Sequence, residues 1–302
     1  DLHSFPTRRS SDLHIASGSS VLWGGLLNLS ARLGSSSKIS LNNSLTRSAD
    51  NEGVILTGEN EEFSQFNPLY VTRLQYIQRS VRSNQLVGEH LFGARHHIDW
   101  RIANSRVTRD EPDRADIAYT ATSTPDGLEP SQWPGQPRFA TRTFSDLKET
   151  SWDGGLDYRL ALRPQGDPIF VKVGTAFRST DRESNTRAYD IFNLTLPQGE
   201  LSRPPEELFS EDRINAGSFG LRANANGGRY TADEKIYAGY GMVDVPLGAN
   251  LRVITGARVE RWELDVNSIS TTGTVAPARP RNTDVLPSIY MEIGRASCRE
   301  RV

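Results

Sequence analysis

The chain has 302 residues, with 35 basic side chains, 37 acidic side chains and a single Cys. A net charge of −2 gives no electrostatic basis for binding nucleic acid, and one Cys excludes a disulfide scaffold. The longest uncharged apolar run, residues 21–27, is far shorter than the ~20 residues that a membrane-spanning helix needs.

The two ends of the chain are related to each other as DNA. When residues 3–12 are back-translated, the complementary strand encodes residues 293–302. This relation is typical of a short sequencing adapter translated at both ends of an insert. We therefore expect residues 1–13 and 292–302 to be adapter-derived, and residues 14–291 to be a fragment of a longer protein.

Alternation of apolar and polar side chains with period two recurs along the chain and predicts β-strands. In chain order it is clear at 23–33, 38–50, 96–105, 156–163, 169–182 and 251–260, and less regular at 69–91 and 230–247. In the stretch 169–182, for example, Val171 and Val173 share one face whereas Lys172 and Arg178 share the other.

Short and long connections alternate strictly between these predicted strands. The short ones are 34–37, 92–95, 164–167 and 246–250, and the long ones are 51–68, 110–138, 190–230 and 267–283. A soluble antiparallel sheet with one wet face would explain the alternation within strands. A barrel in an outer membrane explains the connections as well, because it has short periplasmic turns and long extracellular loops. The sequence thus predicts an all-β fold, a partial antiparallel transmembrane β-barrel wall of about nine strands.

Several stretches have an order and spacing that are familiar from one family of barrels. They are 85–90, 98–100 with 109–113, 172–182, and 237–247 followed by 256–260 and 284–289. On these residues the sequence resembles a TonB-dependent outer-membrane receptor. The resemblance implies a Gram-negative outer membrane and active import of a scarce nutrient such as a siderophore, cobalamin or a carbohydrate. It also implies three kinds of partner: membrane lipid, a plug domain of the same protein, and the TonB energy-transducing complex.

Two other classes stay open at this point: a passive porin or adhesin barrel, and a soluble β-rich binding module. The sequence has no Gly-rich phosphate loop, no nucleophile elbow and no zinc-protease motif. We therefore expect no enzymatic activity, no cofactor and no catalytic or metal site.

Charged residues on the polar side of the predicted strands are expected to face the lumen, where they would contact a plug or a passing substrate. They are Asp157, Arg159, Lys172, Arg178, Arg182, Arg258 and Glu260. The alternative role for them is cross-strand ion pairing along the wall.

Two further groups lie in the predicted long connections. Trp133 and Tyr189 are candidates for ligand contact, with the interfacial aromatic girdle as the alternative. An acidic run at the start of one connection has the oxygen ligands that calcium prefers, but Pro112 and the lack of a Gly-centred ligand loop favour a solvated loop instead. Its members are Asp110, Glu111, Asp113 and Asp116.

Overall fold

The computed structural model describes residues 13–66, 68–125, 127–162, 168–248 and 251–293. Most of the two predicted adapter-derived ends, residues 1–12 and 294–302, therefore lies outside the described residues. None of the helices within the described ranges is long and apolar enough to cross a membrane.

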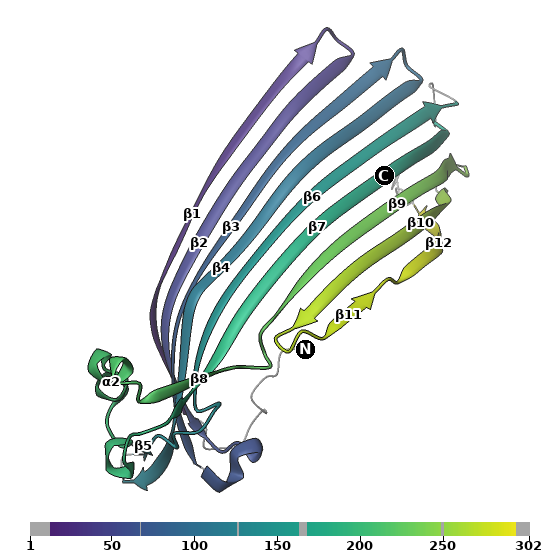
Figure 1. Cartoon of the computed structure of the whole chain (residues 1–302). Coiled ribbons are helices and arrows are strands. Elements are labelled where there is room, and N and C mark those ends of the chain that lie inside the picture. Colours follow the sequence, from purple (N-terminus) through teal and green to yellow (C-terminus); the bar gives the residue numbers. More distant parts are fainter. Residues whose placement is uncertain (1–12, 67, 126, 163–167, 249–250, 294–302) are drawn as a thin grey trace, which may run out of the picture.

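The described chain forms one curved antiparallel sheet, shown in Figure 1. Nine long strands make up its body, as the alternation predicts. They are β1 (Leu13–Leu33), β2 (Ser37–Gly58), β3 (Leu69–Phe92), β4 (His96–Thr124), β6 (Ala140–Ala161), β7 (Phe170–Asn193), β9 (Gly228–Pro246), β10 (Leu251–Ser270) and β12 (Arg281–Ile293). Each long strand pairs with the next one along the chain, and the sheet does not close, because β1 and β12 do not pair with each other.

The register of the ladder gives the sheet two distinct faces. Arg159 lies opposite Lys172, which lies opposite Met242, whereas Tyr158 lies opposite Val173. Since side chains alternate along a strand and directly paired residues share a face, these rows define the sides of the whole sheet. We call the side with Arg159 and Lys172 the polar face, and the side with Tyr158 and Val173 the apolar face.

All the short connections lie at one end of the sheet, and the long ones lie at the other. The strands extend further toward the long connections than the sequence predicts. Residues 110–124, for example, were expected to be part of a loop, but they continue β4 and pair with β3, with β6 and with the short strand β5 (Gly127–Gln132). The physical reason is that polar side chains do not interrupt a ladder held by backbone hydrogen bonds, so strands continue where the alternation fades.

The long connections pack together into a small core at this end of the sheet. The connection after β7 contains the 3₁₀ helix η2 (Gln198–Glu200), the helices α1 (Pro205–Leu208) and α2 (Glu211–Asn215), and the short strand β8 (Phe219–Ala223), which pairs with β7. The connection after β2 contains η1 (Glu61–Phe66), and β11 (Val275–Ala278) pairs with β10. The buried residues of the core are Leu69, Val71, Tyr119, Trp133, Phe139, Ala140, Leu201 and Leu208.

One irregularity in β4 determines which side chains reach the polar face near these connections. The register shifts between Glu111 and Arg114, so that four residues of β4 span three positions of β6. This is a β-bulge, which leaves one residue without a direct partner. Because of the bulge, Glu111 and Arg114 lie on the same face although their positions in the sequence differ by three, an odd number.

Candidate functional site

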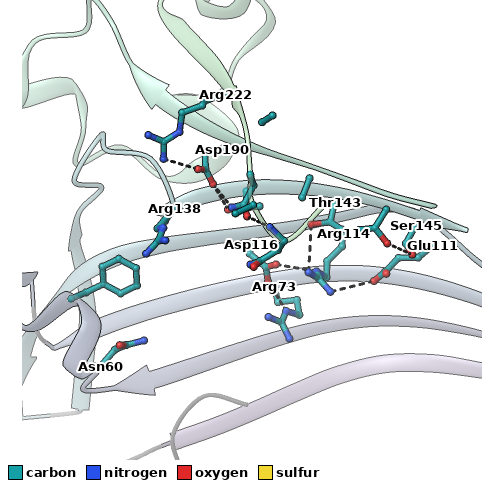
Figure 2. Close-up of a pocket in the computed structure, with 18 of the residues that line it drawn as sticks. Asn60, Arg73, Glu111, Arg114, Asp116, Arg138, Thr143, Ser145, Asp190 and Arg222 are labelled. Carbon is teal, nitrogen blue, oxygen red and sulfur yellow. Dashed lines mark hydrogen bonds and ion pairs between the residues drawn. The ribbon is translucent and has the colours of Figure 1, made fainter. Parts of the chain in front are cut away.

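A cavity of about 950 Å³ lies on the polar face where the strands meet the long connections (Figure 2). Its floor comes from four neighbouring strands, β3, β4, β6 and β7, and its rim from residues that follow β2 and β8. The charged residues that line it are Arg73, Arg109, Glu111, Arg114, Asp116, Arg138, Asp190 and Arg222.

Glu111 and Asp116 form the centre of the cavity floor. The Glu111 carboxylate is only 2% exposed, and it accepts hydrogen bonds from Gln75 Nε2 at 2.7 Å and Arg109 Nη2 at 3.0 Å. Asp116 lies between two guanidinium groups, with Arg73 Nε at 2.5 Å and Arg114 Nε at 3.0 Å. Such charge-assisted bonds hold planar guanidinium groups in fixed orientations. The floor is therefore a preorganised array of cations.

Asp190 organises the opposite wall of the cavity. It is 1% exposed, and its two oxygens accept hydrogen bonds from Arg222 Nη2 at 3.1 Å and Asn224 Nδ2 at 2.6 Å. Thr141 Oγ1 is a weaker donor at 3.4 Å. This buried carboxylate fixes the residues after β8 against β6 and β7, because leaving it unpaired would cost several kcal/mol (~3–5).

Arg138 lines the cavity, and its backbone has an unusual conformation. Its φ angle of 77° is the only positive value among the described residues other than Gly. Pro137 precedes it, and the Phe139 N–H donates to the Gln136 carbonyl at 3.4 Å. This is the pattern of a type II turn, in which the third position normally holds Gly. An Arg at such a position stores backbone strain, which is typical of functional sites.

The overall charge of the cavity is positive. Five guanidinium groups line it against three carboxylates, and the carboxylates of Glu111, Asp116 and Asp190 are already engaged by protein donors. Arginine combines permanent charge with a planar fork of donors that matches carboxylate and phosphate groups. Chemically, the cavity is suited to hold a polyanionic small molecule.

Sequence reasoning did not single out the five arginines of this cavity. Arg109 and Arg114 differ by an odd number of positions, so strict alternation assigns them to opposite faces, and the bulge in β4 is not visible in the pattern. Arg222 is far from the other four in sequence. The one available signal was Arg138 after a Pro, since Gly is the residue expected there.

The seven charged residues that the sequence assigned to the lumen all lie on the polar face. The cavity lies further from the short turns than they do. Most of them form ion pairs with neighbours: Lys172 with Asp157 at 3.5 Å, Arg178 with Asp153 at 2.6 Å, Arg258 with Glu260 at 2.7 Å, and Arg182 with Glu149. Arg159 Nη2 lies 3.0 Å from His97 Nδ1. Three of these ion pairs join β6 to β7, as the alternative role has it, whereas Arg258 and Glu260 pair along β10 itself.

Trp133, a candidate for ligand contact, does not line the cavity, and its side chain has no exposed surface in the structure. It is packed against Phe209 and Phe219, with ring centroids 5.3 and 6.1 Å away, in the core of the long connections. Tyr189 lies within β7, on the face opposite Asp190, where its ring meets Phe144 at 6.3 Å. It does not line the cationic cavity.

The acidic run also differs from its predicted role. Its residues belong to β4, and they do not converge on one point, because Asp110 and Asp113 lie on the face opposite Glu111 and Asp116. Arginines occupy the carboxylates of Glu111 and Asp116. In the part of the chain that the structure describes, no group of three or more His, Cys, Asp or Glu side chains could hold a metal ion.

Comparison with known proteins gives a likeness in fold. No family model matches the sequence, and no curated protein matches it. Among solved structures, the chain is similar to the closed form of the ferric-catecholate import receptor Fiu from E. coli K12. The identity is 14%, the TM-score is 0.42, and the match covers 94% of this chain and 47% of that one. The chain thus spans about half the length of that receptor.

Proposed function

We propose that this chain is a segment of the wall of an outer-membrane receptor that binds a scarce anionic nutrient and, within the longer protein, imports it. The wall spans the membrane, and the cationic cavity holds the ligand on the side of the long connections. The observation that carries this proposal is the exposed apolar face of the sheet.

Large apolar side chains on that face are open to solvent in every long strand. On strands other than the two edge strands, their exposures run from 38 to 51%: Leu86, Ile102, Trp152, Leu156, Val173, Phe177, Tyr237, Val243 and Val259. A contiguous apolar surface of this extent is not found on a soluble monomer, where it would cause aggregation. Contact with lipid explains it directly.

The height of the apolar surface fits a bilayer. Along β6 and the residue that follows it, the exposed apolar residues run from Trp152 to Leu162, a distance of about 33 Å at ~3.3 Å per residue. With the usual strand tilt of ~40°, this corresponds to roughly 25 Å along the membrane normal, which is the height of the lipid-facing band of a barrel. Beyond Trp152 the same face of β6 continues with Thr150 and Lys148, so the band ends there.

The two ends of the sheet support a particular orientation of the wall in the membrane. Short turns such as 34–36 are typical of the periplasmic side, and long connections are typical of the outer side. The cavity then opens toward the medium, and its excess of guanidinium groups favours an anionic ligand. The plug domain and the TonB complex are proposed as partners on the sequence resemblance. No catalytic role is proposed for the chain.

Cysteine labelling of the full-length protein tests the proposal. Val173→Cys and Ala176→Cys, each in a background without other Cys residues, place a thiol on the apolar and polar faces of β7 in turn. After folding into phosphatidylcholine vesicles, a bimane at position 173 should be quenched by brominated lipid, and one at position 176 should not. A charged maleimide should react only at position 176. Equal reactivity at both positions would show that the wall is not in the bilayer.

A further inference from the structure

Four cations gather on the apolar face just beyond the apolar band, on the side of the long connections. Arg82 of β3 lies directly opposite Arg106 of β4. In the adjacent row of the ladder, Arg47 of β2 and Lys148 of β6 flank Ser80 and Thr108. All four cationic side chains are exposed. We call these four residues the outer cationic patch.

In the part of the chain that the structure describes, no cation of the patch is held in an ion pair. Two like charges directly opposite each other in an antiparallel pair are destabilising. On the same face, the nearest carboxylates are those of Asp181, opposite Thr150, Glu183, opposite Lys148, and Asp110 and Asp146, which lie opposite each other in the next row. Among the described residues none of these four forms an ion pair with a cation of the patch, and Arg47 instead lies over the Trp23 ring at 5.9 Å.

The surroundings of the patch identify the kind of anion that would neutralise it. A row of amides, Asn43, Asn84 and Asn104, separates it from the apolar band, and the next row contains Leu41, Leu86 and Ile102. An anion bound by the patch would therefore carry an apolar part that lies along these side chains. The hydroxyl groups of Ser80 and Thr108 lie between the cations and can donate to phosphate oxygens.

We propose that the outer cationic patch binds the phosphate of an anionic membrane lipid in the leaflet next to the long connections. The acyl chains of that lipid follow the band past Leu86 and Ile102. The bound phosphate relieves the repulsion between Arg82 and Arg106, so the lipid stabilises the wall where the protein alone would strain it. This inference rests on the proposed membrane location, but it does not depend on the ligand of the cavity.

The test compares two double variants of the full-length protein with equal changes in charge. Arg82→Gln with Arg106→Gln removes half of the patch. Arg101→Gln with Arg159→Gln is the control, because both of these residues lie on the polar face of the sheet. Binding of phosphatidylglycerol is measured by native mass spectrometry in neutral detergent, with phosphatidylcholine as the reference lipid. Since one cation near an anionic lipid contributes about fivefold in affinity, the patch variant should bind on the order of 20-fold more weakly.

A second measurement separates binding from folding. In phosphatidylcholine alone, the patch variant should unfold at a higher temperature than the wild type, because the repulsion is gone. With phosphatidylglycerol present the order should reverse. Three results would overturn the proposal: unchanged lipid selectivity in the patch variant, an equal loss in the control, or displacement of the lipid by millimolar inorganic phosphate. A protein that does not enter bilayers at all would instead contradict the proposed function.

Discussion

The turn that presents Arg138 allows a test in which stability and binding change in opposite directions. Replacing Arg138 with Gly removes a side chain that lines the cavity and relaxes a φ of 77°. A left-handed conformation costs an L-residue about 1–2 kcal/mol. The extra freedom of Gly in the unfolded chain offsets roughly 0.5–1 kcal/mol of this. The expected net result is a stabilisation of about 0.5–1 kcal/mol.

Binding should change in the other direction. With citrate as a polyanionic probe, the loss of one charge-assisted hydrogen bond should weaken binding by about tenfold or more. Isothermal titration calorimetry on the full-length protein gives the affinity for citrate. Denaturant titration followed by Trp fluorescence gives the stability, because Trp133 is buried in the core beside this turn.

The matched control is Arg138→Gln, which removes the charge and keeps the strained backbone. It should lose the same affinity for citrate without any gain in stability. The reasoning is refuted if Arg138→Gly lowers the free energy of unfolding, since the turn would then not be strained. It is also refuted if both variants bind citrate as tightly as the wild type, since the cavity would then not recognise anions.

Three further outcomes are expected. Glu111→Gln should cost about 3 kcal/mol of stability in a denaturant titration, because it breaks a buried pair with Arg109. It should also tighten citrate binding, because it removes a negative charge from the cavity. If neither stability nor affinity changes, the charges of the cavity do not act as described. Trp133→Phe should cost less than ~1.5 kcal/mol of stability, because the indole N–H has no hydrogen-bond partner among the described residues. Trp133→Ala should cost about 3–5 kcal/mol, because it removes the whole ring. Equal losses in the two variants would show that the indole N–H does stabilise the fold. The hydrogen bond from Arg203 holds the pKa of Glu200 below its ordinary value of 4.5, against a smaller opposing effect of burial. The stabilising effect of this lowered pKa should be complete above pH 4.5 and should be lost as the pH falls through the folded-state pKa, which a pH titration of Trp fluorescence can detect. A loss of stability as the pH rises would contradict this direction of the pKa shift.

The body of the sheet could be predicted from the sequence because its signal is local. Strict alternation at Lys172 and Val173, or at Arg258 and Val259, fixes the face of every neighbour, and the turns are short enough to impose antiparallel pairing. Where the alternation fades, the prediction failed at 110–124, because backbone hydrogen bonds continue the ladder without help from the pattern.

The cavity could not be predicted in the same way. Its arginines come from segments as distant as Arg73 and Arg222, and their proximity depends on how the long connections pack. Trp133 shows the same limit. As a polar-rich stretch with several Pro residues, its surroundings look like an exposed loop, yet Phe209 and Phe219 of a later connection cover its ring. Contacts of such long range leave no periodic trace in the sequence.

The bulge in β4 makes the strand unequally tolerant of changes in length. Removal of Pro112 or Asp113 would convert the bulge into a regular ladder and leave every other side chain of β4 on its present face. Removal of Asn104 would instead advance the segment between that point and the bulge by one position, which would turn Arg109 and Glu111 toward the apolar face. Deletion of one residue at the bulge is therefore expected to have little effect on the faces of β4. Deletion of one residue at Asn104 instead moves side chains of the cavity floor to the apolar face of the sheet.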